Sequence, residues 1–339
     1  MTAPETMEAL LVEQLPEDDG WCFEPKWDGF RCLAQRIGSE VMLWSRSGKP
    51  LGRYFPEIVA MVAGLPEGDL LLDGELIVET AEGLDFDALS QRLHPAESRI
   101  RKLAAETPAR LVAFDLLLQR GDEDLAMKPL SERRRSLERW HAKARNAGLL
   151  LSPQTGDLTQ ARDWLERSGG ALDGVVAKRA EDPYRAGERA MRKVKRHRSA
   201  DCVVGGFRTE AKGSAVASLL LGLYDDQGLL HHVGFCSGLK AAERRRWTAE
   251  LVPLIEEPGF TGNRPDKASR WATERTTAWQ PLRPEIVVEV RYDQVTSGRF
   301  RHATRLLRVR PDKRPDQCRC EQLRHPLTPV QLEELLRSK

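Results

Sequence analysis

The chain has 339 residues, of which 40% are hydrophobic and 31% are charged, and its net charge is only +2. This length favours two domains, and the charged fraction argues against a fibrous or membrane protein; every apolar run is shorter than the roughly 18 residues of a membrane helix. The first residues lack the basic and then apolar order of a signal peptide, so we expect a cytoplasmic protein.

The first part of the chain alternates short strands with helices. Apolar runs predict strands at residues 21–35, 41–45, 70–78, 111–118 and 174–178. Helical spacing predicts a helix at 130–146, between Pro129 and Gly148, and another at 157–168. This mixture predicts an α+β fold for a first domain, which we place at residues 1–198.

From residue 202 onward the pattern changes to closely spaced apolar strands with glycine turns. Strands are predicted at residues 202–207, 217–224, 229–235, 285–292 and 305–310, with a helix at 240–251. Five short strands with one helix are typical of the small oligonucleotide-binding (OB) barrel. We therefore predict an OB-fold domain at residues 199–339, in which residues 256–284 form a long surface connection.

The cysteines and histidines give little sign of a metal centre. The six cysteines are scattered and form no CxxC pair, which predicts reduced thiols and no zinc site. Cys318 and Cys320 form a lone CxC, which is more often incidental than a metal site. His231 and His232 are adjacent, so on a strand they would point to opposite faces, and we expect structural roles for both.

The small net charge hides two basic stretches, at residues 185–198 and 291–314. Such a run is usually a solvated face, but two of them favour a phosphate-rich partner. We expect the second stretch to be the main backbone-binding face.

The sharpest local signal lies at residues 24–31, where Lys26 stands in the pattern K-x-D-G. A nucleophilic lysine must lose its proton, which desolvation or nearby positive charge favours. Lys193 and Lys195 could supply that charge, because on a strand both would point to one face and Val194 to the other. Alone, K-x-D-G would more often mark an ordinary surface lysine.

Seven short motifs, however, occur in one order along the chain. They are KWDG at 26–29, SRSG at 45–48, DGE at 73–75, FDLL at 114–117, DGVVAK at 173–178, KVK at 193–195 and RPDK at 310–313. In this order the chain resembles the covalent nucleotidyltransferases, which comprise ATP-dependent DNA ligases, RNA ligases and mRNA capping enzymes. Residues 288–292 and the compact build resemble the stand-alone bacterial ligases of the ligase C kind.

The resemblance implies a two-domain nucleotidyltransferase and OB fold, with Lys26 as the residue that becomes lysyl-AMP. Lys193 and Lys195 would neutralise the α-phosphate as negative charge develops. The implied ligands of the nucleotide and of the nick's 5′-phosphate are Glu24, Arg31, Arg46, Glu75 and Phe114. Arg310, Asp312 and Lys313 would orient the departing pyrophosphate during the first step.

Phe114 would stack on adenine, with Glu24 at the edge of the base. The alternative is a core position, because period two places Phe114 on one face with Val112 and Leu116. Asp73 and Glu75 also share a face, and two acids on an apolar strand need a partner or a metal ion.

The implied metal ligands for Mg²⁺ or Mn²⁺ are Asp28, Glu75 and Asp173. The family usually has glutamate where this chain has Asp173, which is one methylene shorter but still offers oxygen ligands. Asp28 could instead steer the nick hydroxyl or stabilise the turn before Gly29.

We therefore expect an ATP-dependent DNA ligase that seals nicks in duplex DNA, through Lys26, in DNA repair. ATP is favoured over NAD because only twenty-five residues precede Lys26 and no cysteine quartet follows the second domain. The alternatives are an RNA ligase or capping-type enzyme, and a catalytically silent nick-binding protein. The expected DNA contacts are Arg46, Arg291, Arg299 and Arg301, and we expect a monomer, associated with the nucleoid if bacterial, with neither zinc nor a membrane as partner.

Overall fold

The computed structural model describes residues 2–66, 68–81, 83–119, 124–167, 172–195, 198–210, 213–265, 278–296, 298–323 and 329–337. The chain divides into two units, one of Met1–Arg196 with Pro326–Lys339 and one of His197–His325. The boundary expected after residue 198 lies two residues from this division. Residues 326–339, which we expected in the second domain, are grouped with the first unit.

The central sheet of the first unit has the strand order β4-β3-β5-β7-β8, with the short β6 beside β5. Its strands are β3 (Phe30–Ile37), β4 (Glu40–Ser45), β5 (Leu70–Thr80), β6 (Gly83–Leu84), β7 (Ala109–Gln119) and β8 (Leu149–Leu151). The pairs are antiparallel except for β7 and β8. The central strands β5 and β7 are buried along most of their length, which explains why most of their residues are apolar.

A second sheet of the first unit has the order β1-β10-β9-β2. Its strands are β1 (Ala9–Val12), β2 (Trp21–Trp27), β9 (Leu172–Arg179) and β10 (Met191–Val194). The single strand predicted at residues 21–35 is wrong. Strand β2 ends before Asp28 and Gly29, and after these two residues the chain enters β3 in the central sheet. A Cβ at Gly29 would lie 2.1 Å from the carbonyl oxygen of Leu76, so the crossing requires glycine.

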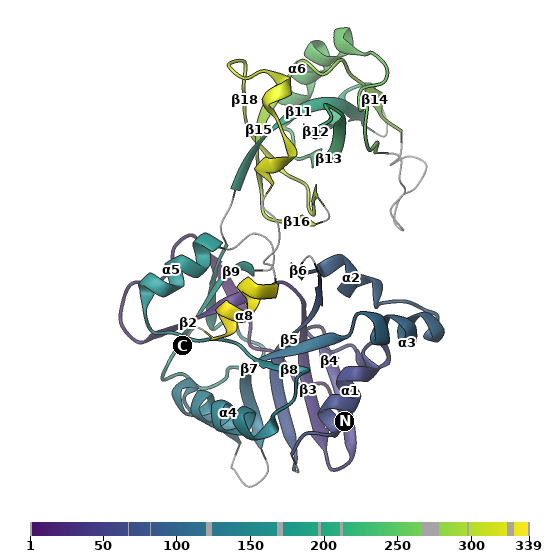
Figure 1. The fold of residues 1–339 in the computed structure, drawn as a ribbon. Helices are drawn as coiled ribbons and strands as arrows, with labels where there is room; N and C mark the ends of the chain where they lie inside the picture. The colour runs from purple at the N-terminus through teal and green to yellow at the C-terminus, as the bar shows by residue number, and fades with distance from the viewer. Residues whose placement is uncertain are drawn as a thin grey trace. The chain divides into compact units, whose positions relative to one another are not determined.

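Helices cover both sheets of the first unit. They are α1 (Pro56–Ala63), α2 (Phe86–Gln91), α3 (Glu97–Glu106), α4 (Leu130–Ala144), α5 (Leu158–Arg167) and α8 (Pro329–Arg337), with 3₁₀ turns at Gly52–Tyr54 and Leu125–Met127. Helix α4 follows Pro129 as predicted and ends at Arg145, whose φ of 43° is left-handed. Leu332 and Leu335 of α8 are buried in the same apolar cluster as Trp164 of α5, and Figure 1 shows α8, in yellow, on this unit. The last helix therefore completes the core of the first unit.

The second unit is built on one curled sheet with the order β13-β12-β11-β15-β18, with β14 beside β11. Its strands are β11 (Arg198–Thr209), β12 (Val216–Tyr224), β13 (Leu230–Cys236), β14 (Gln280–Pro281), β15 (Val287–Tyr292) and β18 (Arg305–Val309), beside the hairpin β16 (Val295–Thr296) and β17 (Arg299–Phe300). A bridge between Cys236 and Thr304, the residue before β18, connects the two edge strands. The sheet thus has the curvature expected of a small barrel.

Helix α6 (Ala241–Leu251) packs on this sheet, and its Trp247 is buried in the core of the unit. Short 3₁₀ turns occur at Val252–Leu254, Pro315–Gln317 and Cys320–Gln322. The predicted surface connection at 256–284 is only partly described, because residues 266–277 lie outside the described residues. Within the described part, Phe260 and Leu282 are buried, so this segment also contributes to the core. No described helix has the length and apolar character needed to cross a membrane.

Candidate active site

Lys26 lies where β2 leaves its regular pairing with β9. Pro25 pairs with Val175 and Trp27 with Leu172, so Lys26 faces Gly174 and Asp173 across an irregular register. Its ammonium nitrogen is 2.5 Å from Asp173 Oδ2. Gly174 has a φ of 127°, and a Cβ there would lie 2.0 Å from the carbonyl oxygen of Val194, which brings β10 against this turn.

The three lysines predicted to act together meet at this point. Lys195 Nζ lies 2.8 Å from the same Asp173 oxygen, and Val194 is buried in the core, as the alternation predicted. Partial burial, and then the charges of Lys26, Lys195 and Arg46, lower the pKa of Lys193. Burial acts to raise the pKa of Asp173, but Lys26 and Lys195 outweigh it and leave this pKa below its usual range. Cations therefore crowd around a single carboxylate.

Glu75 lies beside these lysines on β5. One of its oxygens accepts a hydrogen bond of 3.1 Å from the backbone N–H of Gly29. Burial raises the pKa of Glu75 to about 7, against the opposing effects of Lys26 and Arg31 and with the support of the Asp28 charge. The carboxyl group is therefore poised to change its protonation near neutral pH.

Arg31 is held by an acid that the sequence left without a partner. Its Nε and Nη2 donate to the two oxygens of Asp73, both at 2.5 Å, and Nη2 also donates to the carbonyl oxygen of Met7 at 3.2 Å. Tyr184 donates its hydroxyl to Asp73 at 2.6 Å. These contacts use three of the five N–H groups of Arg31 and fix its guanidinium 4.8 Å from the ring centre of Phe114. Asp73 thus serves to position Arg31.

Phe114 sits at a β-bulge in β7. Asp73 pairs with Asp115 while the next residue, Gly74, pairs with Ala113, so Phe114 is the extra residue. The prediction that it shares a face with Val112 and Leu116 is wrong, because the bulge interrupts the alternation and these two residues belong to different apolar clusters. Phe114 instead lines the cavity.

Glu24 is fixed by two residues that the sequence reasoning did not select. Lys178 Nζ lies 2.7 Å from Glu24 Oε2, and Gln154 Nε2 donates to Oε1 at 2.7 Å. The Lys178 ammonium also lies 4.6 Å from the ring centre of Phe114. Lys178 belongs to the DGVVAK motif and could have been found there, whereas no pattern in the sequence marks Gln154.

These side chains surround a cavity of about 840 Å³ formed entirely by the first unit. Its lining includes Glu24, Lys26, Asp28, Arg31, Arg46, Glu75, Phe114, Lys178 and Lys193. Arg46 lies at its exposed edge, just after β4, with Nε 3.4 Å from Glu8. The volume is in the range of small-molecule sites, and the lining combines an aromatic ring with clustered cations, which suits a nucleotide.

The implied divalent cation fits this site only with help from other ligands. Among the described residues, no three His, Cys, Asp or Glu side chains gather as a possible metal ligand set. Asp28 and Glu75 nevertheless line the cavity, and Asp173 adjoins it through Lys26. Mg²⁺ is commonly held by one or two carboxylates, water and substrate phosphates, and these three residues fit that mode of binding.

The remaining predicted residues belong to the second unit. Arg310 and Lys313 both bind Asp201, at 3.0 Å and 2.7 Å. Arg299 Nη2 contacts His232 Nδ1 at 2.9 Å, and Arg301 Nη1 donates to Gln294 at 2.6 Å. Arg291 is partly exposed on β15. The structure thus places Arg299 and Arg301 on or beside one hairpin, with Arg291 on the neighbouring strand.

Comparisons with known proteins identify the family of the chain. Residues 5–195 match the family described as "ATP dependent DNA ligase domain", and residues 212–313 match "ATP dependent DNA ligase C terminal region". The chain is 44% identical to DNA ligase C of Mycobacterium tuberculosis (strain ATCC 25618 / H37Rv), over 95% of this chain and 94% of the relative. It is 43% identical to DNA ligase C1 of Mycolicibacterium smegmatis (strain ATCC 700084 / mc(2)155), again over 95% and 94% of the two chains.

The fold is also similar to that of a solved Lig E DNA ligase. The TM-score is 0.51 at 18% sequence identity, over 89% of this chain and 99% of that chain. At this identity the similarity concerns the fold alone.

Proposed function

The chain belongs to the ATP-dependent DNA ligase family, and from that membership we propose how its residues seal nicks in duplex DNA. Its fold is the predicted nucleotidyltransferase and OB-fold pair, and its cofactors are ATP and a divalent metal ion. The observation that carries the proposal is the position of Lys26, on a cavity of about 840 Å³ and next to Lys193 and Lys195. We propose an adenylation domain at residues 1–198, whose core α8 (Pro329–Arg337) completes, and an OB-fold domain that begins at residue 199 and ends before α8.

The reaction takes place in three displacements at phosphorus. Lys26 Nζ attacks the α-phosphorus of ATP, an N–P bond forms, the bond to pyrophosphate breaks, and the amine proton passes to solvent. The 5′-phosphate of the nick then attacks the lysyl-AMP phosphorus and releases Lys26. The 3′-hydroxyl finally attacks the activated 5′-phosphate and expels AMP, which closes the strand.

The shared carboxylate of Asp173 supports the role of Lys26 as nucleophile. Lys26 must be uncharged to attack. Once Lys26 has lost its proton, it no longer forms an ion pair with Asp173. Lys195 binds the same oxygen at 2.8 Å and keeps that carboxylate paired. Lys193 and Lys195 then stabilise the negative charge that develops on the α-phosphate.

The walls of the cavity suit the rest of the nucleotide. Phe114 stacks on adenine, and Glu24, fixed by Lys178 and Gln154, accepts hydrogen bonds at the edge of the base. Arg31 and Glu75 hold the ribose, and Arg46, exposed at the edge of the cavity, binds the 5′-phosphate of the nick. Arg310 and Lys313 orient the departing pyrophosphate in the first step.

Mg²⁺ or Mn²⁺ would be held by Asp173, Glu75 and Asp28 together with the nucleotide, and would supply Lewis-acid stabilisation of the phosphate charge. Arg46, Arg291, Arg299 and Arg301 contact the DNA backbone, which predicts salt-sensitive binding. We propose that the protein acts as a monomer on nicked duplex DNA, in the cytoplasm at the nucleoid, during repair.

The test is to incubate the protein with α-³²P-labelled ATP and a divalent metal, and to follow the label on a denaturing gel. We expect the protein to retain the label, Lys26→Ala to lose it, and nicked DNA to discharge it into sealed product.

An unlabelled wild-type protein would be treated with pyrophosphate first, to remove any AMP acquired during expression. If it then still failed to take up label, the proposal would be wrong and a silent nick-binding protein would be favoured. Discharge into nicked RNA but not into nicked DNA would favour an RNA ligase.

A further inference from the structure

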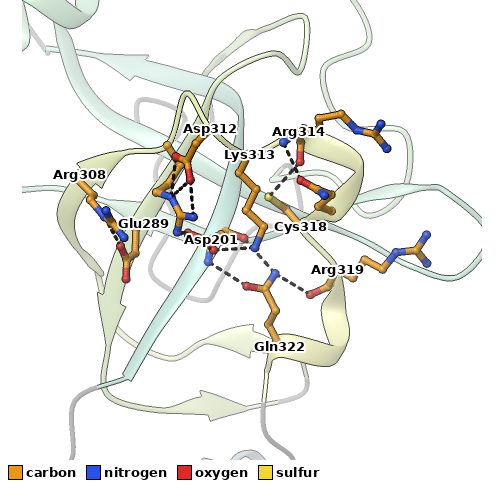
Figure 2. Close-up of polar contacts among 11 residues, drawn as sticks. Asp201, Glu289, Arg308, Asp312, Lys313, Arg314, Cys318, Arg319 and Gln322 are labelled. Carbon is orange, nitrogen blue, oxygen red and sulfur yellow. Dashed lines mark hydrogen bonds and ion pairs between the residues drawn. The ribbon is translucent and has the colours of Figure 1, made fainter.

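The second unit contains a carboxylate that binds both of the cations assigned to pyrophosphate. Arg310 Nη1 donates to the two oxygens of Asp201 at 3.0 and 3.2 Å, and Lys313 Nζ lies 2.7 Å from Asp201 Oδ2 (Figure 2). Asp201 lies on β11, whereas Arg310 and Lys313 follow β18. The contact therefore ties the RPDK motif to a strand that is distant in the sequence.

Asp201 is itself held firmly. Its backbone N–H donates to Gln322 Oε1 at 3.0 Å, and Gln322 Nε2 donates back to the Asp201 carbonyl oxygen at 3.2 Å. Its strand is paired with β15, where Glu289 stands opposite Asp201. The Asp201 side chain is only 14% exposed. The carboxylate is thus a fixed point, to which two long side chains from a turn are attached.

The contacts leave both cations able to bind a second anion. Arg310 is also held by Asp312, through Nε at 3.0 Å and Nη2 at 2.8 Å. The two carboxylates together use three of its five N–H groups, and Asp201 uses one of the three on Lys313. The remaining donors come from two adjacent cations, an arrangement that matches the several oxygens of a pyrophosphate.

We propose that Asp201 is a positioning residue for the first step of ligation, which holds Arg310 and Lys313 together so that both act on the departing pyrophosphate. This inference rests on the proposed function of those two residues. Without the carboxylate, two neighbouring cations repel each other. The Lys313 side chain also regains the rotamer freedom that the contact removes. Asp201 therefore reduces both the repulsion between the two cations and the rotamer freedom of Lys313 before ATP binds.

The test is a comparison of single steps in Asp201→Asn. Asparagine keeps the size of the side chain and removes its charge. We expect the single-turnover rate of lysyl-AMP formation to fall about 10- to 100-fold, the usual cost of misplacing a group that acts on the transition state. Sealing of a nick that already carries AMP on its 5′-phosphate should stay within about twofold of wild type, and Asp201→Glu should restore most of the adenylation rate.

Glu250→Gln is the matched control, because Glu250 lies on α6 of the same unit and binds Arg246 at 2.8 Å instead. It should leave both steps unchanged. An adenylation rate in Asp201→Asn that equals or exceeds that of wild type would overturn the inference. Equal losses in both steps with a lowered melting temperature would also overturn it, because they would indicate a purely structural ion pair.

The proposed function is tested by other variants in the same assay. Wild-type protein must form lysyl-AMP, and Arg310→Ala must form it more slowly. If either of these fails, the assigned role of the RPDK motif is wrong; if both hold and Asp201→Asn behaves as wild type, only the inference about Asp201 is wrong.

Discussion

Each unit of the molecule uses one aspartate to bind two cations, but the surroundings of the two aspartates differ. Asp173 binds Lys26 and Lys195, and partial burial, followed by the charges of these two lysines and of Arg46, lowers the pKa of Lys193. Asp201 binds Arg310 and Lys313, and here the hydrogen bond to Asp312 and then the charge of Asp201 raise the pKa of Arg310. The first site has an excess of cations, and the second is rich in acids.

This difference fits the proposed roles of the two sites, in which the first holds the phosphate of AMP and the second only helps pyrophosphate to leave. An anion that enters the first site relieves repulsion among the lysines, so phosphate binding is favoured there. In the second site an anion must share Arg310 and Lys313 with carboxylates that already bind them, so it is bound weakly and released easily. This contrast supports our proposal that the first unit forms the covalent bond to AMP and that the second unit acts only during the departure of pyrophosphate.

The largest effect should follow from removing the shared carboxylate of the first site. In Asp173→Asn, Lys26 and Lys195 lose their common partner, and we expect lysyl-AMP formation to fall by about 100-fold or more, as when one preorganised electrostatic contact is lost. The measurement is the single-turnover rate of lysyl-AMP formation with labelled ATP in Asp173→Asn and in Asp201→Asn. We expect the smaller loss in Asp201→Asn.

Asp173→Glu is the control for that experiment. The covalent nucleotidyltransferases usually have glutamate at this position, so Asp173→Glu should keep most of the activity. If Asp173→Asn and Asp201→Asn lost equal activity, the two carboxylates would be equivalent, and the distinction drawn between the units would be wrong.

A second, smaller effect should follow from removing the ring of Phe114. Stacking between a base and an aromatic ring contributes about 1–3 kcal/mol, so Phe114→Ala should raise the KM for ATP by about fivefold to 100-fold. Phe114→Tyr retains the ring and should keep a KM close to that of wild type. A KM that did not change in Phe114→Ala would show that Phe114 is a core residue, which the sequence left as the alternative.

The acids of the two units should also differ in their response to pH. Burial raises the pKa of Glu75 to about 7, whereas the hydrogen bond from Arg310 lowers the pKa of Asp312 to about 2. Between its ordinary pKa of 4.5 and about 7, Glu75 binds more protons in the folded state than in the unfolded one. Its contribution to stability is therefore complete below pH 4.5 and is lost as the pH rises through 7.

Glu75→Gln tests this sign. The glutamine side chain is neutral and avoids the cost of burying a charge. The melting temperature of the variant should therefore exceed that of wild type, and this difference should be a few degrees larger at pH 8 than at pH 5. Lysyl-AMP formation should be slow in this variant at all pH values, because glutamine cannot replace the carboxylate acceptor. A pH-independent difference for Glu75→Gln would contradict the raised pKa.

The parts of the site that the sequence predicted are those fixed by local order. The motifs identified Lys26, Glu75 and Lys193, and period two correctly predicted that Val194 turns away from the lysines. Period two failed at Phe114, because a bulge depends on how β7 pairs with β5 and leaves no mark in the sequence of β7 alone.

The parts that could not be predicted depend on contacts between distant segments. We predicted no helix at residues 329–337 and placed them in the second domain, whereas Leu332 and Leu335 of α8 pack in the first unit. Gln154 reaches Glu24 across 130 positions, and Asp201 reaches Arg310 across 109. Gln154 and Asp201 position other residues but belong to no motif, because only the fold brings them next to their partners.

The smallest effect concerns the arginines of the second unit that we propose to contact DNA. Arg299 contacts His232, and burial, followed by the charges of Arg299 and Arg208, lowers the pKa of that imidazole to about 3. The imidazole is therefore neutral at pH 7 and does not offset the charge of Arg299, unlike the acids that surround Arg310. Arg299→Ala should weaken binding to nicked DNA a few-fold and reduce the slope of log K against log salt by about 1. Arg246→Ala, on α6 and paired with Glu250 at 2.8 Å, should leave that slope unchanged, and equal slopes for the two variants would place the DNA on another face of this unit.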